Sequence, residues 1–140
     1  MKTAYALIAT LVIAGCSQTA PHSVMLNPQK VVVAPHPWPT AAATAPKAPP
    51  RIIAVTLNET TIAPGDRWRG RIATSTNVAS VEIRTESFSF VAERTAFGEF
   101  RFEQHVLDLV PQYKRAYLLY IIARNAAGVQ TERVVPIRFL

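Results

Sequence analysis

The feature that most constrains the fold is a series of short runs after residue 50 in which apolar and polar side chains alternate. In the run from Arg67 to Ser75, Trp68, Gly70 and Ile72 share one face and the arginines share the other. A period of two residues is the period of a β-strand, whose successive side chains point to opposite faces. No long run has the helical period, so the sequence predicts an all-β domain.

Turn residues divide this region into strands of similar length. Ala63-Pro64-Gly65-Asp66 and Asn125-Ala-Ala-Gly128 are the clearest turns. Many short strands at a spacing of about 8 to 12 residues are typical of an antiparallel β-sandwich. We therefore predict about seven strands, over residues 51–59, 67–75, 78–85, 87–93, 99–107, 116–125 and 129–140.

Two of these motifs resemble those of bacterial immunoglobulin-like or fibronectin-III-like domains. The first is Pro64-Gly65-Asp66 before the second strand, and the second runs from Tyr117, with Leu119, Ile121 and Ala123, to the turn at Gly128. The resemblance implies an immunoglobulin-like sandwich over residues 51–140. It also implies that Tyr117 is the tyrosine corner, whose hydroxyl bonds to backbone upstream. The chain departs from antibody domains because it has no cysteine pair and carries its tryptophan on the second strand.

Composition changes sharply near Arg51. All nine acidic residues lie between Glu59 and Glu132, whereas eight of the eleven prolines precede Arg51. Proline removes amide donors and biases the preceding residue away from helix, and the apolar content here is low. We expect residues 16–50 to be a largely disordered tether and residues 51–140 to be the folded domain.

The first residues have the form of an export signal. Lys2 precedes an apolar run from Ala4 to Ala14, which is signal-peptide length and too short to span a membrane comfortably. The end of the run, Ile13-Ala14-Gly15-Cys16, resembles the lipobox of bacterial lipoproteins. That resemblance implies removal of residues 1–15, diacylglyceryl modification of Cys16 and acylation of its new amine. The alternative is an ordinary secretory signal with a coincidental cysteine.

The residue that follows the cysteine bears on sorting. Ser17 stands where enteric-type lipoproteins retained in the inner membrane tend to have Asp. By the same resemblance we expect an outer-membrane anchor, with the domain in the periplasm or at the cell surface.

The sequence offers no catalytic constellation. Cys16 is the only cysteine, and the predicted domain contains a single histidine, His105. A cysteine nucleophile, a histidine cluster and a Cys/His metal site in the domain are excluded by this count. We therefore expect no enzyme, no metal and no cofactor. The predicted domain has 12 basic and nine acidic residues, and this mixture of signs, with a net charge of +3, does not favour nucleic-acid binding.

Three groups of residues are candidates for contact with other molecules. The first is an apolar row on the outer face of the strand over 116–125, formed by Leu118, Tyr120 and Ile122. Because such a row is unusual on a face exposed to solvent, we expect it to be covered by the tether, by a partner or by a second copy of the chain. A Val-rich tether segment and an aromatic within prolines could dock on a sheet edge or a partner. These tether residues are Val31, Val32, Val33 and Trp38.

The third group is a stripe of arginines. Arg67, Arg69 and Arg71 share a face and could dock on an anionic surface. The alternative, which we favour, is that they pair across strands with Glu82, Glu86, Glu99 or Glu103.

Together these features predict a membrane-anchored envelope lipoprotein that binds or scaffolds a protein partner. An accessory subunit of a secretion, conjugation or pilus machine is the leading hypothesis. The alternatives are a surface-displayed adhesin-like or glycan-binding module, and an exclusion or immunity lipoprotein of a mobile element.

Overall fold

In the part of the chain that the structure describes, two β-sheets pack together and one short 3-10 helix is present. The computed structural model describes residues 24–25, 37–108 and 111–140. In chain order the elements are β1 (Val24–Met25), β2 (Ile52–Leu57), β3 (Thr61–Ile62), β4 (Arg67–Thr74), β5 (Val78–Arg84), β6 (Ser89–Val91), β7 (Glu93–Ala96), β8 (Glu99–His105), η1 (Pro111–Tyr113), β9 (Ala116–Asn125) and β10 (Gln130–Phe139).

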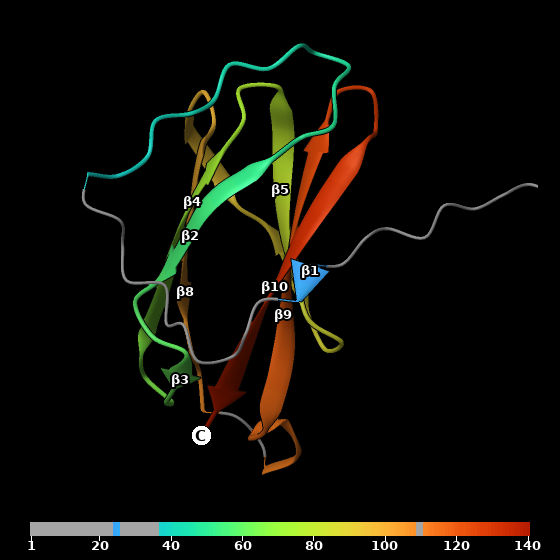
Figure 1. Ribbon diagram of the computed structural model, residues 1–140. Coiled ribbons are helices and arrows are strands. Elements are labelled where there is room, and N and C mark those ends of the chain that lie inside the picture. Colours follow the sequence, from blue (N-terminus) through green and yellow to red (C-terminus); the bar gives the residue numbers. More distant parts are fainter. Residues whose placement is uncertain (1–23, 26–36, 109–110) are drawn as a thin grey trace, which may run out of the picture.

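The two sheets face each other as the layers of a sandwich (Figure 1). One sheet has the order β1-β10-β9-β5-β6, with β3 also paired to β10, and the other has the order β2-β4-β8-β7. On one side the layers are joined by Arg133 of β10, which donates to the carbonyl of Ile52 on β2 over 3.1 Å. Burial lowers the pKa of this arginine. The opposite side is bounded by the edge strands β6 and β7.

This strand order is that of an immunoglobulin-like sandwich. That fold places strands A, B, E and D in one sheet and strands G, F and C in the other, with C′ added in variable-type domains. Here β2, β4, β8 and β7 occupy the first set, and β10, β9, β5 and β6 occupy the second. The prediction of an all-β immunoglobulin-like domain is confirmed.

The core consists of the side chains that the alternating pattern assigned to the inner faces. Trp68 is 2 % exposed and Ile72 is fully buried, while the arginines between them point outward. Leu119 and Ile121 of β9 are also fully buried. Gly70 lies against the ring of Phe102, since a Cβ at this position would overlap with Phe102 Cε1.

The tyrosine corner is present. The hydroxyl of Tyr117 donates to the carbonyl of Tyr113 over 3.2 Å, four residues upstream. This bond fixes the start of β9 against η1, as the resemblance implied.

The structure contains strands that alternation did not reveal. β7 has four exposed residues and therefore no apolar face to signal it. β1 and β3 have two residues each and both pair with β10 in parallel. The strand predicted over residues 87–93 is shorter in the structure, where β6 ends at Val91. The amide of Ala92 still donates to the carbonyl of Val81 on β5, and the chain then crosses to the other sheet and forms β7.

Residues 38–50, which we call the strap, run over one end of the sandwich, opposite the C-terminus (Figure 1). Asn77 Nδ2 donates to the carbonyls of Ala45 and Ala48, and Asn125 Nδ2 donates to those of Pro46 and Ala48. The hydroxyl of Thr131 donates to Pro50 over 2.7 Å. The expectation of a disordered tether up to residue 50 is therefore wrong for the strap, because its carbonyls are bound by side chains of the domain.

The predicted export signal, including Ile13, Ala14, Gly15 and Cys16, lies outside the described residues, as do Val31, Val32 and Val33. Within the part of the chain that the structure describes, no helix has the length and apolarity needed to cross a membrane.

Candidate functional site

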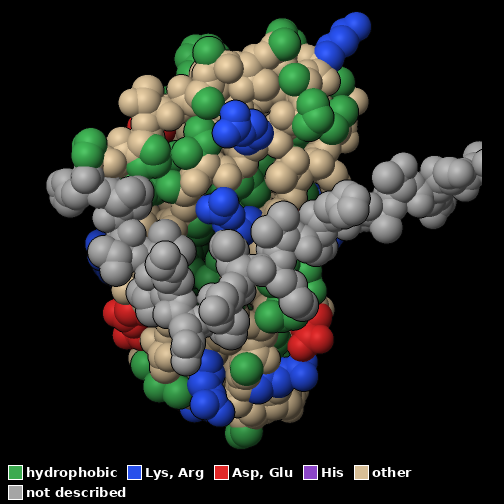
Figure 2. All heavy atoms as spheres, in the orientation of Figure 1, with side chains coloured by type: hydrophobic (Ala, Val, Ile, Leu, Met, Phe, Trp, Pro, Cys, Tyr) green, Lys and Arg blue, Asp and Glu red, His purple; other side chains and the backbone are tan. Residues whose placement is uncertain are grey.

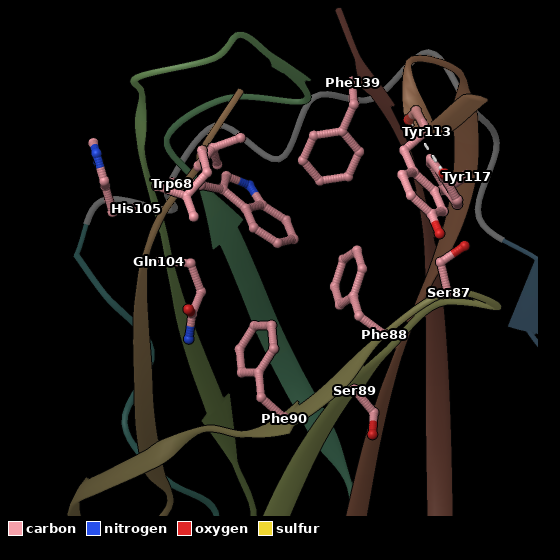
Figure 3. Close-up of a pocket in the computed structure, with 12 residues that line it drawn as sticks. Trp68, Ser87, Phe88, Ser89, Phe90, Gln104, His105, Tyr113, Tyr117 and Phe139 are labelled. Atoms are coloured by element: carbon pink, nitrogen blue, oxygen red, sulfur yellow. Dashed lines mark hydrogen bonds between the residues drawn. The ribbon is translucent and has the colours of Figure 1, made fainter. Parts of the chain in front are cut away.

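A cleft of about 490 Å³ lies between the two sheets and could receive another molecule. It opens between β8 and the hairpin that joins β5 to β6 (Figure 3). Its lining comes from both sheets and from the connection after β8: Trp68, Ser87, Phe88, Ser89, Phe90, Gln104, His105, Val106, Leu107, Tyr113, Tyr117 and Phe139. We call this the aromatic cleft.

Aromatic rings form most of its inner surface. In Figure 3, Trp68, Phe88, Phe90 and Phe139 face a common space, whereas the ring of His105 points away from it. Trp68 meets Phe88 and Phe139 edge to face, with centroids 6.4 and 6.0 Å apart. Phe88 and Phe90 are stacked at 6.2 Å. Edge-to-face and stacked pairs fix ring orientations, so the surface is preformed.

A tight turn positions Phe88 at the entrance. The hydroxyl of Thr85 accepts hydrogen bonds from the amides of Ser87 and Phe88, at 3.1 and 3.2 Å. The amide of Thr85 in turn donates to the carbonyl of Phe88 over 2.8 Å. Threonine side chains commonly hold turns of this kind. The turn leaves Phe88 partly buried, with its ring against the core.

The far end of the aromatic cleft is fixed by backbone contacts. Val106 donates its amide to Asp66 and accepts from Gly65, which holds the end of β8 against the turn before β4. Gly65 has a φ of +88°, a conformation that favours glycine. The predicted Pro64-Gly65-Asp66 turn thus supports this end of the site.

The rim carries paired charges. Arg115 binds Glu86 at 2.6 Å, and Lys114 lies 3.6 Å from Asp108. Arg115 also lies over the ring of Tyr117, 5.0 Å from its centroid. Its hydrogen bond with Tyr117 and the Glu86 carboxylate raise the pKa of Arg115, so it remains a cation. Among the described residues, the lining has no carboxylate, lysine or arginine, and it is therefore suited to an uncharged group.

The predicted outer row of β9 is only partly accessible. Leu118 is 45 % exposed, whereas Ile122 is only 1 % exposed, although it alternates with the inward Ile121 and therefore lies on the outer face as predicted. Its cross-strand neighbours are Glu82 and Glu132, and Glu82 binds Arg124 two residues along β9 at 2.6 Å. Tyr120 is half-buried. The row offers one exposed apolar side chain rather than a continuous patch.

The arginine stripe has the cross-strand pairing that we favoured. Arg67 and Arg69 both bind Glu103, at 3.1 and 3.3 Å, and Arg71 binds Glu99 at 3.2 Å. Over the face shown in Figure 2, basic side chains are dispersed, with acidic side chains at its margins, rather than gathered into one patch.

Trp38 contacts the domain rather than standing free. Its ring lies under the guanidinium of Arg71, 4.3 Å from the centroid. A cation over a tryptophan face is a favourable contact, worth about 0.5 to 1 kcal/mol where exposed. The tether aromatic singled out in the sequence is thus the first contact of the strap with the sandwich.

Among residues 37–108 and 111–140, no group of three or more His, Cys, Asp or Glu could hold a metal ion. Sequence reasoning placed Trp68 on the same face as Gly70 and Ile72 but did not bring Trp68, Phe88 and Phe90 together as a site. The sequence feature that could have indicated the site is the pair of phenylalanines at 88 and 90, two residues apart and so on one side of the strand that becomes the edge strand β6.

The fold and the cleft define a class: an immunoglobulin-like β-sandwich with an open aromatic cleft at one edge. No protein-family model matches the sequence, and no curated protein matches it. Among solved structures it is similar to fibronectin(III)-like modules of CbhA from Clostridium thermocellum, at 18 % identity and a TM-score of 0.46, over 61 % of this chain and 94 % of that one. It is also similar to a superoxide reductase (neelaredoxin) from Ignicoccus hospitalis, at 14 % identity and a TM-score of 0.40, over 66 % and 80 %.

Proposed function

We propose that this protein is a lipid-anchored bacterial envelope lipoprotein whose sandwich binds a protein partner and catalyses no reaction. We further propose that it serves as an accessory subunit of a secretion, conjugation or pilus machine. The observation that supports binding most directly is the aromatic cleft, about 490 Å³ in volume and lined by rings from both sheets. Concave, preformed, mainly apolar surfaces are the usual form of binding sites.

The anchor is supported by the sequence. Lys2, the apolar run and Ile13-Ala14-Gly15-Cys16 have the order of a lipoprotein signal. An acyl chain contributes about 0.8 kcal/mol for each buried methylene, so two or more chains hold a protein stably on a membrane. By the lipoprotein resemblance, that membrane is the outer membrane.

The anchor is tested by labelling cells that express the full chain with radioactive palmitate. Incorporation into the wild type and its loss in Cys16→Ser support the anchor. Unchanged labelling of Cys16→Ser, or no labelling of the wild type, contradicts it.

Partner binding is tested by capture from detergent-solubilised envelopes of the producing bacterium with the tagged full chain. We expect one envelope protein to be retained by the wild type and by Leu118→Ser, and to be lost with Phe88→Ser. Retention of no protein above a tag-only control contradicts a protein-binding role.

A second candidate is binding of a glycan. Aromatic rings stack on sugar faces, and Trp68, Phe88 and Tyr117 lie together in the cleft. Trp68 is almost wholly buried, however, and the polar lining is confined to the Ser, Gln, His and Tyr groups. We therefore place protein binding first; a glycan array that gave binding lost in Phe88→Ser would reverse the order.

A further inference from the structure

We propose that the free part of β8 accepts an extended strand from the protein partner, and that the inward side chains of this strand enter the aromatic cleft. The proposal rests on the proposed function and deepens it, because it names the form of the partner's contact. It is drawn from three observations: a position beside β8 that no described strand occupies, backbone groups that point into that position, and uncharged rings beneath it.

The vacant position follows from the sheet pairing. β7 pairs with β8 only along residues 99–101, with Glu93 opposite Arg101 as its last pair. The chain then crosses at Ala92 to the other sheet. Beyond that point, β8 continues through His105 with β4 on one side only, among the residues that the structure describes. Five residues beyond Arg101, to Val106, span about 17 Å of strand.

The backbone groups in this stretch have a defined direction. Val106 exchanges hydrogen bonds with Asp66 and Gly65, so its amide and carbonyl point toward the β4 side. Backbone groups of successive residues in a strand point to alternate sides. Those of Glu103 and His105 therefore point away from β4, into the vacant position. A second strand is the ligand that matches donors and acceptors repeated every two residues.

The chemistry of the incoming strand follows from the surfaces around that position. Its inward residues would face Phe88, Phe90 and Trp68, and none of the described side chains that line the cleft is a carboxylate, lysine or arginine. The nearby ions already have partners, Arg115 with Glu86 and Arg67 with Glu103. An uncharged, apolar inward row therefore complements the site, with polar residues alternating on the outer side.

The alternation also separates this proposal from glycan binding. A sugar can stack on the rings, but it does not use the amides of Glu103 and His105 in a repeated ladder. Strand addition requires both the rings and these amides.

The test uses the full chain in detergent micelles and a phage-displayed library of random nine-residue peptides. Peptides that bind the wild type are synthesised and titrated against His105→Pro, His105→Ala and Phe88→Ser. His105→Pro removes an amide that points away from β4 and so breaks no bond to that strand. His105→Ala keeps the amide and is the matched control.

We expect enriched peptides in which apolar residues alternate, and affinity about tenfold weaker for His105→Pro and for Phe88→Ser but unchanged for His105→Ala. Amide hydrogen exchange of Glu103 and His105 should slow in the complex. Failure to enrich, enrichment without alternation, or equal affinity of His105→Pro and His105→Ala would overturn strand addition.

These outcomes are distinct from failure of the proposed function. If the full chain captures an envelope protein that His105→Pro binds as well as the wild type, partner binding stands and strand addition is wrong. If peptides bind as expected but no envelope protein is captured, the proposed function is wrong.

Discussion

Replacing Asn125 by alanine tests whether the strap is part of the folded domain. Asn125 is 4 % exposed, and its side chain makes four hydrogen bonds. Nδ2 donates to the carbonyls of Pro46 and Ala48 at 3.3 and 3.0 Å, and Oδ1 accepts from the amides of Ala127 and Val129 at 3.0 and 2.9 Å. One side chain therefore binds both the strap and the β9–β10 turn.

The expected loss follows from this count. Each hydrogen bond contributes about 1 kcal/mol net to the free energy of unfolding. Because the exposed amides of the turn can bind water instead, Asn125→Ala should lower the free energy of unfolding by about 3 kcal/mol. A domain of this size loses about 4 to 8 °C in Tm per kcal/mol, which gives a fall of between about 12 and 24 °C. Two of the four bonds go to the strap. In a chain that begins at Arg51, the cost should therefore be about half, near 1.5 kcal/mol.

Urea denaturation of both chain lengths measures these costs. Asn58→Ala is the matched control, because Asn58 bonds only to β4 backbone, at Arg67 and Arg69. Its cost should be the same with and without residues 1–50. Equal costs of Asn125→Ala in the two lengths, or a cost below about 1 kcal/mol in the full chain, would refute the role assigned to the strap.

Three further predictions concern the core, the tyrosine corner and the surface. Gly70→Ala places a Cβ against Phe102 and should lower the free energy of unfolding by about 1 to 3 kcal/mol in thermal denaturation. Changing Phe102 to Leu in the same chain should restore part of this loss, and a Tm of Gly70→Ala at or above that of the wild type would contradict this packing. Tyr117→Phe should lower the free energy of unfolding by about 1 kcal/mol, less than Tyr117→Ala does, and no loss in Tyr117→Phe would show that the hydroxyl contributes nothing beyond the ring. Glu103→Gln should change stability by less than about 1 kcal/mol at 0.15 M salt, because both of its arginine pairs are exposed; a larger loss in chemical denaturation would show a coupled network.

The sandwich was predictable because alternation is a direct consequence of burying one face of a strand. Trp68, Ile72, Leu119 and Ile121 all point inward as their spacing requires. The tyrosine corner was accessible only through a resemblance, since no local property of Tyr117 requires its hydrogen bond.

The remaining features depend on long-range contacts. The strap was not predictable, because proline-rich sequence usually lacks the contacts that offset ordering entropy, and here Asn77 and Asn125 supply them from distant turns. β7 was not predictable because none of its side chains is buried. The aromatic cleft exists because the chain leaves one sheet at Ala92, and that crossover has no signature in a single strand.

We propose that the aromatic cleft, rather than the outer face of β9, binds the partner. The most direct measurement is the dissociation constant of the captured envelope protein for the wild type, for Phe88→Ser and for Leu118→Ser. Binding should be at least about tenfold weaker for Phe88→Ser and unchanged for Leu118→Ser. Unchanged binding by Phe88→Ser together with weakened binding by Leu118→Ser would contradict it.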